Sequence, residues 1–599
     1  MQDIFKSVGI NTVFCDSVHA LKYANNHGLL GNATILTVSP ALIDEKENFP
    51  NFNIENISDV WSRDKLFRYQ RTIKDFAFDI YDCCVKDDIL FEYALVLSRE
   101  AVNSSRLIYK AGLLKDDDIM ESRGMISVET GADPRLEKIN PPYEKLLNSN
   151  DSFINIHVPF EPPENYGLKV PSLVKRLRRA GIESIVYRLG MLLLNKVSFF
   201  WKKGINIYVL RENELLIETA SVLIKKGYSV QNLKSCSASF EVVKHIEDKL
   251  KILLYPAIHS RVKDWVCKSV VDACVEEVVN NMLKSISRQV GATTYWEKNS
   301  FVKSPNSIVL NGYSGKPEDI ALYNVLNKYG NKMCTFQHGV TPELSYILDE
   351  EAPFCETSCS NIFFSYNSKI KKYYESLPFS VGKIKPVGMP KRFYKKKSSN
   401  IVKDDILFVS MNLYRGNINF LTGFLTDYGR FTFERDMVVR ILSRINKIVV
   451  YKPYPETNIR YTEPDPVLKY VNQSSNIRLE SSYVDLRYIV GNYKAVIVSG
   501  ASSTISWIIM SDIPLIFINN DDKLTLRDEF KSDFIDSVIY FDIAENGSYD
   551  RIHSYLNQPI KNIEDDWESK RVARKKLIST WFTSKNSIAG ELASNIITN

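Results

Sequence analysis

Small polar residues gather where one apolar run of the sequence ends. Ala495–Ser499 is a candidate strand, and Ser499-Gly500-Ala501-Ser502-Ser503-Thr504 leads from it directly into a candidate helix, Thr504–Met510. In such a turn free backbone N–H groups, hydroxyl groups and the positive end of the helix dipole converge, which favours an anion such as phosphate. An ordinary N-cap by Ser502 or Ser503 is the alternative, but the turn holds more small polar residues than a cap needs. It is not a Walker loop, because no Gly-Lys-Ser/Thr follows.

A second candidate loop follows the apolar run Lys447–Tyr451. Its sequence is Tyr451-Lys452-Pro453-Tyr454-Pro455-Glu456. Lys452 can neutralise a phosphate, and Tyr454 can donate a hydrogen bond or stack on a base. The two prolines hold the loop rigid, and a merely stiff turn after a strand is the alternative interpretation.

The third loop, Gln337-His338-Gly339, follows the predicted strand Lys332–Phe336. His338 can act as a general acid or base near neutral pH, or bind a phosphate. Gly339 allows the backbone to come close to a ligand. A lone histidine is more often structural, but this one stands at a strand end beside a glycine, which favours a functional role.

A transfer reaction onto a hydroxyl group also needs a base. Three acidic residues of the first half are predicted at strand ends: Glu100, Glu129 and Asp133. A solvated loop carboxylate is the alternative for each, and the sequence does not choose among them.

These loops require a scaffold of alternating strands and helices, and the sequence has that rhythm. Strands are predicted at Asn11–Cys15, Ala33–Val38, Tyr93–Leu97, Met125–Val128, Phe153–Val158, Ile205–Leu210, Ser307–Asn311, Lys332–Phe336, Ile362–Tyr366, Ile406–Ser410, Lys447–Tyr451, Ala495–Ser499, Pro514–Ile518 and Val538–Phe541. Helices are predicted between them, among others at Ser17–Asn26, Glu212–Lys226, Val262–Val290, Pro317–Tyr329, Glu434–Ile445 and Val484–Gly491. The alternation predicts an α/β protein of two Rossmann-like, doubly wound domains. The basic run Lys395–Asn400 marks the expected boundary, which gives residues 1–394 and 395–599, with the last helix able to pack back on the first domain.

The segment 167–204 differs from the rest of the chain in its amino-acid composition. Nine basic residues are interleaved there with Leu, Ile, Val, Phe and Trp, against the single acid Glu183. Such a basic amphipathic segment can lie on an anionic membrane surface. A helical hairpin with a solvated basic face is the alternative. The apolar part, 185–201, is interrupted by polar residues, so we do not expect it to span a bilayer.

Composition narrows the class of protein. The chain has 599 residues, 44% of them hydrophobic and 25% charged, which is typical of a globular protein. A net charge of +6 without a recognisable basic module argues against a nucleic-acid binder. The nine cysteines are scattered and lack zinc-ligand spacing, so we expect free thiols of a reducing compartment and no metal site. No signal peptide is seen, and we expect a cytoplasmic protein.

The order of the loops resembles that of the two-Rossmann (GT-B) transferases that build bacterial capsule, lipopolysaccharide and teichoic acid. In that group a His-Gly motif, a Gly-x-Pro-Arg-like segment, a His-Pro motif and a Ser-Ser motif follow one another. The corresponding positions here are His338-Gly339, Gly388-Met389-Pro390-Lys391, Tyr454-Pro455 and Ser502-Ser503, within roughly residues 305 to 520. Tyr454 stands where the family usually has His. This departure puts in doubt whether the residue contacts the phosphate in the usual way.

The resemblance implies two domains facing a central cleft and a glycosyltransferase that uses a CMP-activated acidic sugar. The acceptor would be a hydroxyl of a capsule or lipopolysaccharide glycan, free or lipid-linked, at the inner face of the membrane. A CDP-glycerol-type polyol phosphotransferase and a non-catalytic glycan- or nucleotide-binding partner are the alternatives. The implied catalytic residues are His338 and one of the acids Asp133, Glu100 and Glu129. The donor-binding residues it implies are Gln337, Gly339, Lys391, Lys452, Tyr454, Pro455, Glu456, Ser499, Gly500, Ser502, Ser503 and Thr504. The donor is a co-substrate, and no cofactor or metal is implied.

Overall fold

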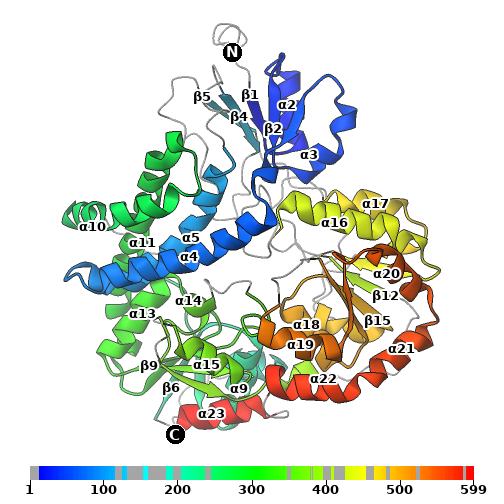
Figure 1. Ribbon diagram of the computed structural model, residues 1–599. Coiled ribbons are helices and arrows are strands. Elements are labelled where there is room, and N and C mark those ends of the chain that lie inside the picture. Colours follow the sequence, from blue (N-terminus) through cyan, green and yellow to red (C-terminus); the bar gives the residue numbers. More distant parts are fainter. Residues whose placement is uncertain are drawn as a thin grey trace.

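Three parallel β-sheets with helices around them make up the protein (Figure 1). The computed structural model describes residues 12–114, 125–130, 153–158, 184–192, 204–236, 244–346, 352–377, 379–380, 382–394, 406–410, 425–453, 465–480, 486–520, 526–583 and 588–599. The sheets follow one another along the chain. We refer to them as the N-terminal, middle and C-terminal sheets.

The N-terminal sheet has five strands in the order β3-β2-β1-β4-β5. They are β1 (Thr12–Cys15), β2 (Thr34–Thr37), β3 (Ile54–Asn56), β4 (Met125–Thr130) and β5 (Phe153–Val158). Helices α2 (Val18–Asn26) and α3 (Pro40–Asp44) begin at serine caps, Ser17 and Ser39, whose hydroxyls accept the N–H groups of Ala20 and Leu42. The strand order matches the first five positions of the Rossmann order 3-2-1-4-5-6.

Four long helices form a layer beside the middle sheet. They are α4 (Arg63–Cys84), α5 (Ala94–Ala111), α10 (Lys244–Val262) and α11 (Val271–Glu297). Their apolar faces share one hydrophobic core with α13 (Pro317–Lys328) and with Val309 and Met333 of the middle sheet. We call these four helices the helical layer.

The middle sheet has six strands in the order β11-β10-β9-β8-β6-β7. They are β6 (Asn206–Arg211), β7 (Ser229–Asn232), β8 (Ser307–Asn311), β9 (Lys332–Phe336), β10 (Ile362–Ser365) and β11 (Lys383–Pro386). The other helices of this part are α9 (Glu214–Lys225), α12 (Ser300–Lys303), α14 (Ala352–Glu356) and α15 (Lys369–Glu375). The direction of winding reverses between β6 and β8, and in such sheets ligands bind beyond the carboxyl ends of the strands at the reversal.

The C-terminal sheet has six strands in the order β14-β13-β12-β15-β16-β17, the order of a complete Rossmann fold. They are β12 (Ile406–Val409), β13 (Val449–Lys452), β14 (Ile477–Leu479), β15 (Ala495–Val498), β16 (Leu515–Asn519) and β17 (Ile539–Asp542). Its helices are α16 (Asp427–Arg440), α17 (Val467–Gln473), α18 (Ser503–Met510), α19 (Asp528–Ser537), α20 (Ser548–Asn557), α21 (Ile560–Ser569) and α22 (Arg571–Leu577). Winding reverses between β12 and β15, so this pair of strands marks its expected ligand edge.

The end of the chain returns to the middle sheet. A π-helical turn, Ile578–Phe582, follows α22, and α23 (Ala589–Thr598) packs against α9 (Figure 1). The backbone N–H of Gly590 donates to Glu218 of α9 at 3.0 Å, and the Lys226 ammonium group donates to Ser594 at 2.8 Å. The last helix therefore joins the two six-stranded sheets.

The predicted α/β class with doubly wound parallel sheets is confirmed, and β8 and β9 have the predicted bounds. The stretch 1–394, taken as one domain, contains two separate sheets. The strand predicted at Tyr93–Leu97 is wrong, because those residues begin α5, whose buried positions continue to Ala111. The basic segment 167–204 lies outside the described residues except for 184–192 and Gly204.

Three helices predicted from the sequence also differ. The helix predicted at Glu434–Ile445 is α16, which begins at Asp427 and ends at Arg440. The run Val262–Val290 spans the end of α10 and most of α11, with Pro256 inside α10. Two short 3-10 turns, Leu486–Tyr488 and Val490–Asn492, replace the helix predicted at Val484–Gly491. Among the described residues no helix is long and apolar enough to cross a membrane.

Candidate functional site

Three polar residues end adjacent strands at the reversal point of the C-terminal sheet. The register pairs Val409 of β12 with Lys452 on one side and with Val498 of β15 on the other. Ser410 and Ser499 directly follow those strands, so Lys452, Ser410 and Ser499 lie along one edge. All three are buried. The predicted strand-end loops therefore meet where a doubly wound sheet binds its ligand.

The turn from β15 into α18 begins the helix with a serine cap. Ser502 is the N-cap with extended backbone, and its hydroxyl accepts the N–H of Thr504 at 3.4 Å. Its own N–H donates to the carbonyl of Gly500 at 3.1 Å. The hydroxyl of Ser499 is buried and finds no hydrogen-bond partner in the part of the chain that the structure describes. Ser502 therefore caps the helix, and the binding of an anion at this turn stays a prediction.

A buried carboxylate supports the same edge from below. Glu434 of α16 is fully buried, and one of its oxygens accepts the hydroxyls of Ser410 at 2.7 Å and Tyr451 at 2.6 Å. Burial, and then the charge of Glu434, hold the pKa of Tyr451 well above its usual range, so this phenol stays a hydrogen-bond donor. The network fixes the ends of β12 and β13.

Gln337 anchors the loop that follows β9. Its side chain is fully buried, accepts the N–H of Tyr366 at 2.7 Å and donates to the carbonyl of Gly339 at 3.0 Å. It was predicted to bind a donor directly. Because both ends of its amide bond to the protein, Gln337 holds the loop in shape instead.

His338 and Gly339 lie where the middle sheet meets α18. The imidazole of His338 is exposed, and the backbone of Gly339 is buried. A Cβ added to Gly339 would lie 2.8 Å from the Cβ of Ser503, the first residue of α18. The predicted juxtaposition of the histidine loop with the serine turn is present, although the two loops belong to different sheets.

Two buried glutamates lie beneath the histidine loop, and the sequence interpretation missed both. Glu343 accepts the side-chain amide of Gln337 at 2.6 Å, and Glu356 accepts the backbone N–H of His338 at 3.0 Å. Burial raises the pKa of Glu343 to about 7 and that of Glu356 to about 8. Nothing in their local sequence marks them, because their partners lie elsewhere in the chain.

Asn213, which precedes α9, ties three loops of the middle sheet together. Its side-chain amide donates to the carbonyls of Gly312 at 3.1 Å, Phe336 at 2.9 Å and Gln337 at 3.3 Å. Its side-chain oxygen accepts the N–H of Leu216 at 2.9 Å and caps α9. Loops after β6, β8 and β9 are thereby fixed by one residue, whose N-cap role is the only part visible in sequence.

Charged groups join the two six-stranded sheets beside the site. Glu214 forms ion pairs with Arg392, and with Arg487 at 2.6 Å, and Arg392 also donates to the hydroxyl of Tyr488. Lys391, predicted to bind the donor, has an exposed side chain, and its backbone N–H donates to Glu218 at 2.6 Å.

Arg527 joins the sheets from the other side of the histidine loop. Its side chain donates to the carbonyl of Pro342, and its backbone N–H donates to Leu344 at 2.8 Å. An isolated antiparallel bridge between Ser345 and Leu526 continues this contact. The segment after the histidine loop is thus held by the C-terminal part of the chain.

The predicted acids do not gather at this site in the described structure. Glu100 lies on α5, where its carboxylate accepts the Ser285 hydroxyl at 2.7 Å inside the helical layer, so its assignment to a strand end is wrong. Only the backbone of Glu129, in β4, is described. Asp133, Tyr454, Pro455 and Glu456 lie outside the described residues.

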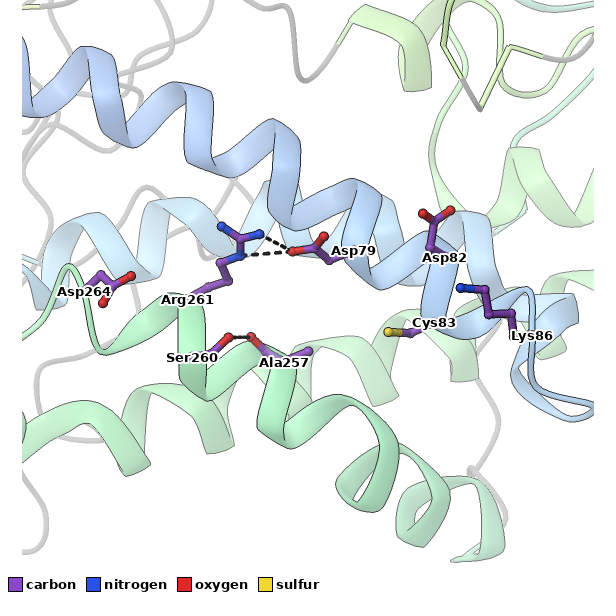
Figure 2. A pocket seen from close by; sticks show the side chains of 8 residues that line it. All are labelled: Asp79, Asp82, Cys83, Lys86, Ala257, Ser260, Arg261 and Asp264. Carbon is purple, nitrogen blue, oxygen red and sulfur yellow. Dashed lines mark hydrogen bonds and ion pairs between the residues drawn. The ribbon is translucent and has the colours of Figure 1, made fainter.

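A polar hollow is found away from this site, between α4 and α10 (Figure 2). Asp79, Asp82 and Asp264 line it, and Arg261 pairs with Asp79 across the two helices. Within the described ranges no group of three or more His, Cys, Asp or Glu side chains could hold a metal ion.

No protein-family model and no curated protein matches the chain. Solved structures match it distantly. UGT2 of Phytolacca americana, complexed with UDP-2-fluoro-glucose and pterostilbene, is 12% identical with a TM-score of 0.35, over 66% of this chain and 99% of that one. A UDP-forming α,α-trehalose-phosphate synthase of Burkholderia xenovorans is 10% identical with a TM-score of 0.36, over 66% and 99%. The spinosyn forosaminyltransferase SpnP is 11% identical with a TM-score of 0.33, over 66% and 100%. Function has to follow from the residues of the site.

Proposed function

We propose that this protein is a glycosyltransferase of two-Rossmann architecture that binds the phosphate of a nucleotide-sugar donor at the N-terminus of α18. The observation that carries the proposal is the contact between Gly339 and Ser503, which brings the residue after His338 against the first residue of α18. Group transfer from a phosphate leaving group requires this pairing of an acid–base side chain with fixed donors to an anion.

Each element of the site has a role in this reaction. The hydroxyls of Ser502, Ser503 and Thr504, with the hydroxyl of Ser499 and the positive end of the α18 dipole, hold the phosphate, and Lys452 contributes positive charge from the adjacent strand end. As the bond between sugar and phosphate oxygen breaks, these groups stabilise the charge left on the nucleotide. His338 assists at the reacting centre. The acceptor oxygen attacks the sugar carbon and gives its proton to a carboxylate, for which Glu129 and Asp133 are the remaining candidates.

The donor we propose is a CMP-activated acidic sugar of the sialic acid or Kdo type. The resemblance in the order of loops supports a cytidine nucleotide, and the acceptor would then be a hydroxyl of a capsule or lipopolysaccharide glycan. A CDP-glycerol-type polyol phosphotransferase is the second candidate, because the same resemblance covers it and the same phosphate site would serve it.

A donor panel tests the proposal. Purified protein is incubated with CMP-sialic acid, CMP-Kdo, CDP-glycerol, UDP-glucose and a dTDP-sugar, with and without a mixture of surface glycans, and released nucleotide is measured. We expect CMP release that increases with acceptor. Turnover with UDP or dTDP sugars alone would overturn the cytidine assignment. Donor binding in calorimetry without any turnover would instead support a non-catalytic binding partner.

The role of His338 is tested by replacement. Because its imidazole is exposed, His338→Ala should fold normally, and its kcat should fall about 100-fold or more. His245→Ala, also exposed but on α10 of the helical layer, is the matched control and should retain wild-type activity. Equal activities of the two variants would remove His338 from the mechanism.

We further propose that the protein attaches peripherally to the cytoplasmic face of the membrane, where a lipid-linked acceptor would lie. The short helix at 184–192 exposes Leu189 by 52% and Leu192 by 66%, one turn apart, within the basic segment of the sequence. Sedimentation with vesicles containing anionic lipid should carry the protein down at low salt, and Leu189→Gln/Leu192→Gln should weaken this. If the fraction of protein that sediments with vesicles depended neither on anionic lipid nor on salt, the proposed attachment would be wrong.

A further inference from the structure

The loop that carries His338 stands on two buried carboxyl groups from different parts of the chain. Glu343 follows the loop after a short turn, and Glu356 ends α14. Both are buried, and each shares a hydrogen bond with the loop. An acid in an interior position needs partners, so the identity of those partners shows what each glutamate holds in place.

Glu356 holds the peptide of the histidine itself. One of its oxygens accepts the backbone N–H of His338 at 3.0 Å, and the other accepts the hydroxyl of Tyr374 at 2.6 Å. On the other side of the same residue, the hydroxyl of Tyr366 donates to the carbonyl of His338 at 3.4 Å. Both polar backbone groups of His338 are therefore bonded to side chains, which fixes the direction in which the imidazole leaves the loop.

Glu343 holds the residue before the histidine. One of its oxygens accepts the amide of Gln337 at 2.6 Å and that of Asn367 at 3.1 Å, and the other finds no hydrogen-bond partner within the described ranges. Asn367 also donates to the carbonyl of Trp581, which comes from the returning C-terminal segment, at 2.6 Å. The support beneath the loop is thus assembled from both six-stranded sheets.

The two acids are short of positive charge. The groups that act on them are hydrogen-bond donors, the charge of Glu343, which acts on Glu356, and Arg527, whose guanidinium acts on Glu343. The phenol of Tyr374 bonds to Glu356, the phenol of Tyr366 lies within reach of the charge of both acids, and His338 contacts Glu356 through its backbone N–H. Burial raises the pKa of both acids towards neutrality, and repulsion by Glu343 adds to the rise for Glu356. The charge on this pair therefore changes over the pH range in which a histidine works.

We propose that Glu356, supported by Glu343, is a positioning residue that orients His338 for the transfer reaction and makes that orientation depend on proton uptake. The inference depends on the proposed function only in naming the reaction as a group transfer. The coupling that we propose between Glu356 and the imidazole of His338 concerns the folded protein alone, and it can be measured without turnover.

The experiment combines kinetics with NMR. Glu356→Gln keeps the size of the side chain and removes its ability to ionise. We expect kcat to fall about tenfold or more, with the donor KM within about twofold of wild type. In protein labelled at histidine carbons, the resonance of His338, assigned by its absence in His338→Ala, should shift, and its titration midpoint should move. Glu277→Gln, a buried glutamate of α11, is the matched control and should move neither reading.

A second variant covers the case in which Glu356→Gln does not fold. Tyr374→Phe removes the other hydrogen bond to the carboxylate and should shift the His338 resonance in the same direction by less. A His338 resonance and midpoint unchanged in Glu356→Gln and Tyr374→Phe would overturn the inference. A wild type that turns over no donor, yet shows the coupled shifts, would remove the proposed function and leave the positioning of His338 supported.

Discussion

Gly339 and Ser503 belong to different sheets, yet a Cβ on the glycine would lie 2.8 Å from the Cβ of the serine. Such a separation is too short for two carbon atoms that are not bonded. A glycine is therefore needed at this position because two segments of the chain approach each other closely. The backbone of Gly339 is not in the left-handed conformation, so backbone conformation does not require a glycine there.

This contact predicts a rescue experiment. Gly339→Ala should lower the unfolding free energy by about 1–3 kcal/mol, because Ser503 is the first residue of a helix and its Cβ cannot rotate away. Ser503→Gly removes the opposing Cβ, so the double variant should recover part of the loss, measured as Tm. Additive losses in the double variant would show that the loop and α18 do not meet as described.

The serine turn predicts a loss of anion affinity that is separable from folding. Ser499→Ala and Ser503→Ala should each weaken the binding of CMP by about tenfold, measured by calorimetry. Each variant lacks a serine hydroxyl that would donate a hydrogen bond to the charged phosphate. Ser300→Ala is the matched control, since Ser300 also begins a helix, α12, and is exposed. CMP affinity that is unchanged in all three variants would leave Ser502 as a simple N-cap and the turn without a ligand.

Asn213 predicts a large effect on stability from a residue that touches no proposed ligand. In Asn213→Ser the cap on α9 is kept, but the bonds to the carbonyls of Gly312, Phe336 and Gln337 are lost. We expect the unfolding free energy to fall by about 2–3 kcal/mol in denaturant titrations. A fall below about 0.5 kcal/mol, the usual range of a surface change, would contradict the role of Asn213 in joining the three loops.

Sequence alone predicted the parts of this protein that are local. The strands β8 and β9 are short, buried apolar runs between turn residues, and Ser502 is a cap beside its helix, so each is fixed by its neighbours. The strand prediction for Tyr93–Leu97 was wrong because five apolar residues fit a strand and a buried helix equally. Only the continuation of the buried positions to Ala111 identifies the helix. Strand order, which separates the first half into two sheets, is set by pairing between distant segments.

The same reasoning explains which site residues were missed. Apart from the cap of Asn213 on Leu216, the partners of Glu343, Glu356 and Asn213 lie between 6 and 124 positions away along the chain, at Gln337, His338, Tyr374, Gly312 and Phe336. No periodicity or spacing encodes such bonds. His338 and Ser503 were found because each stands at the end of a strand or the start of a helix, where α/β folds place their ligand groups.

The two buried glutamates predict how stability depends on pH. Their pKa values rise from 4.5 in the unfolded chain to about 7 for Glu343 and about 8 for Glu356, so between these values the folded protein binds protons that the unfolded chain releases. The unfolding free energy then decreases as pH increases: their contribution is fully present below about pH 4.5 and is lost as pH rises through about 7 to 8. Glu343→Gln/Glu356→Gln removes both groups, so its stability should fall less than that of wild type between pH 5 and pH 8, by on the order of 1 kcal/mol or more. Denaturant titrations at a series of pH values measure the difference. Parallel curves for the two proteins would mean that both carboxyl groups titrate at their ordinary values and carry no proton in the folded state at neutral pH.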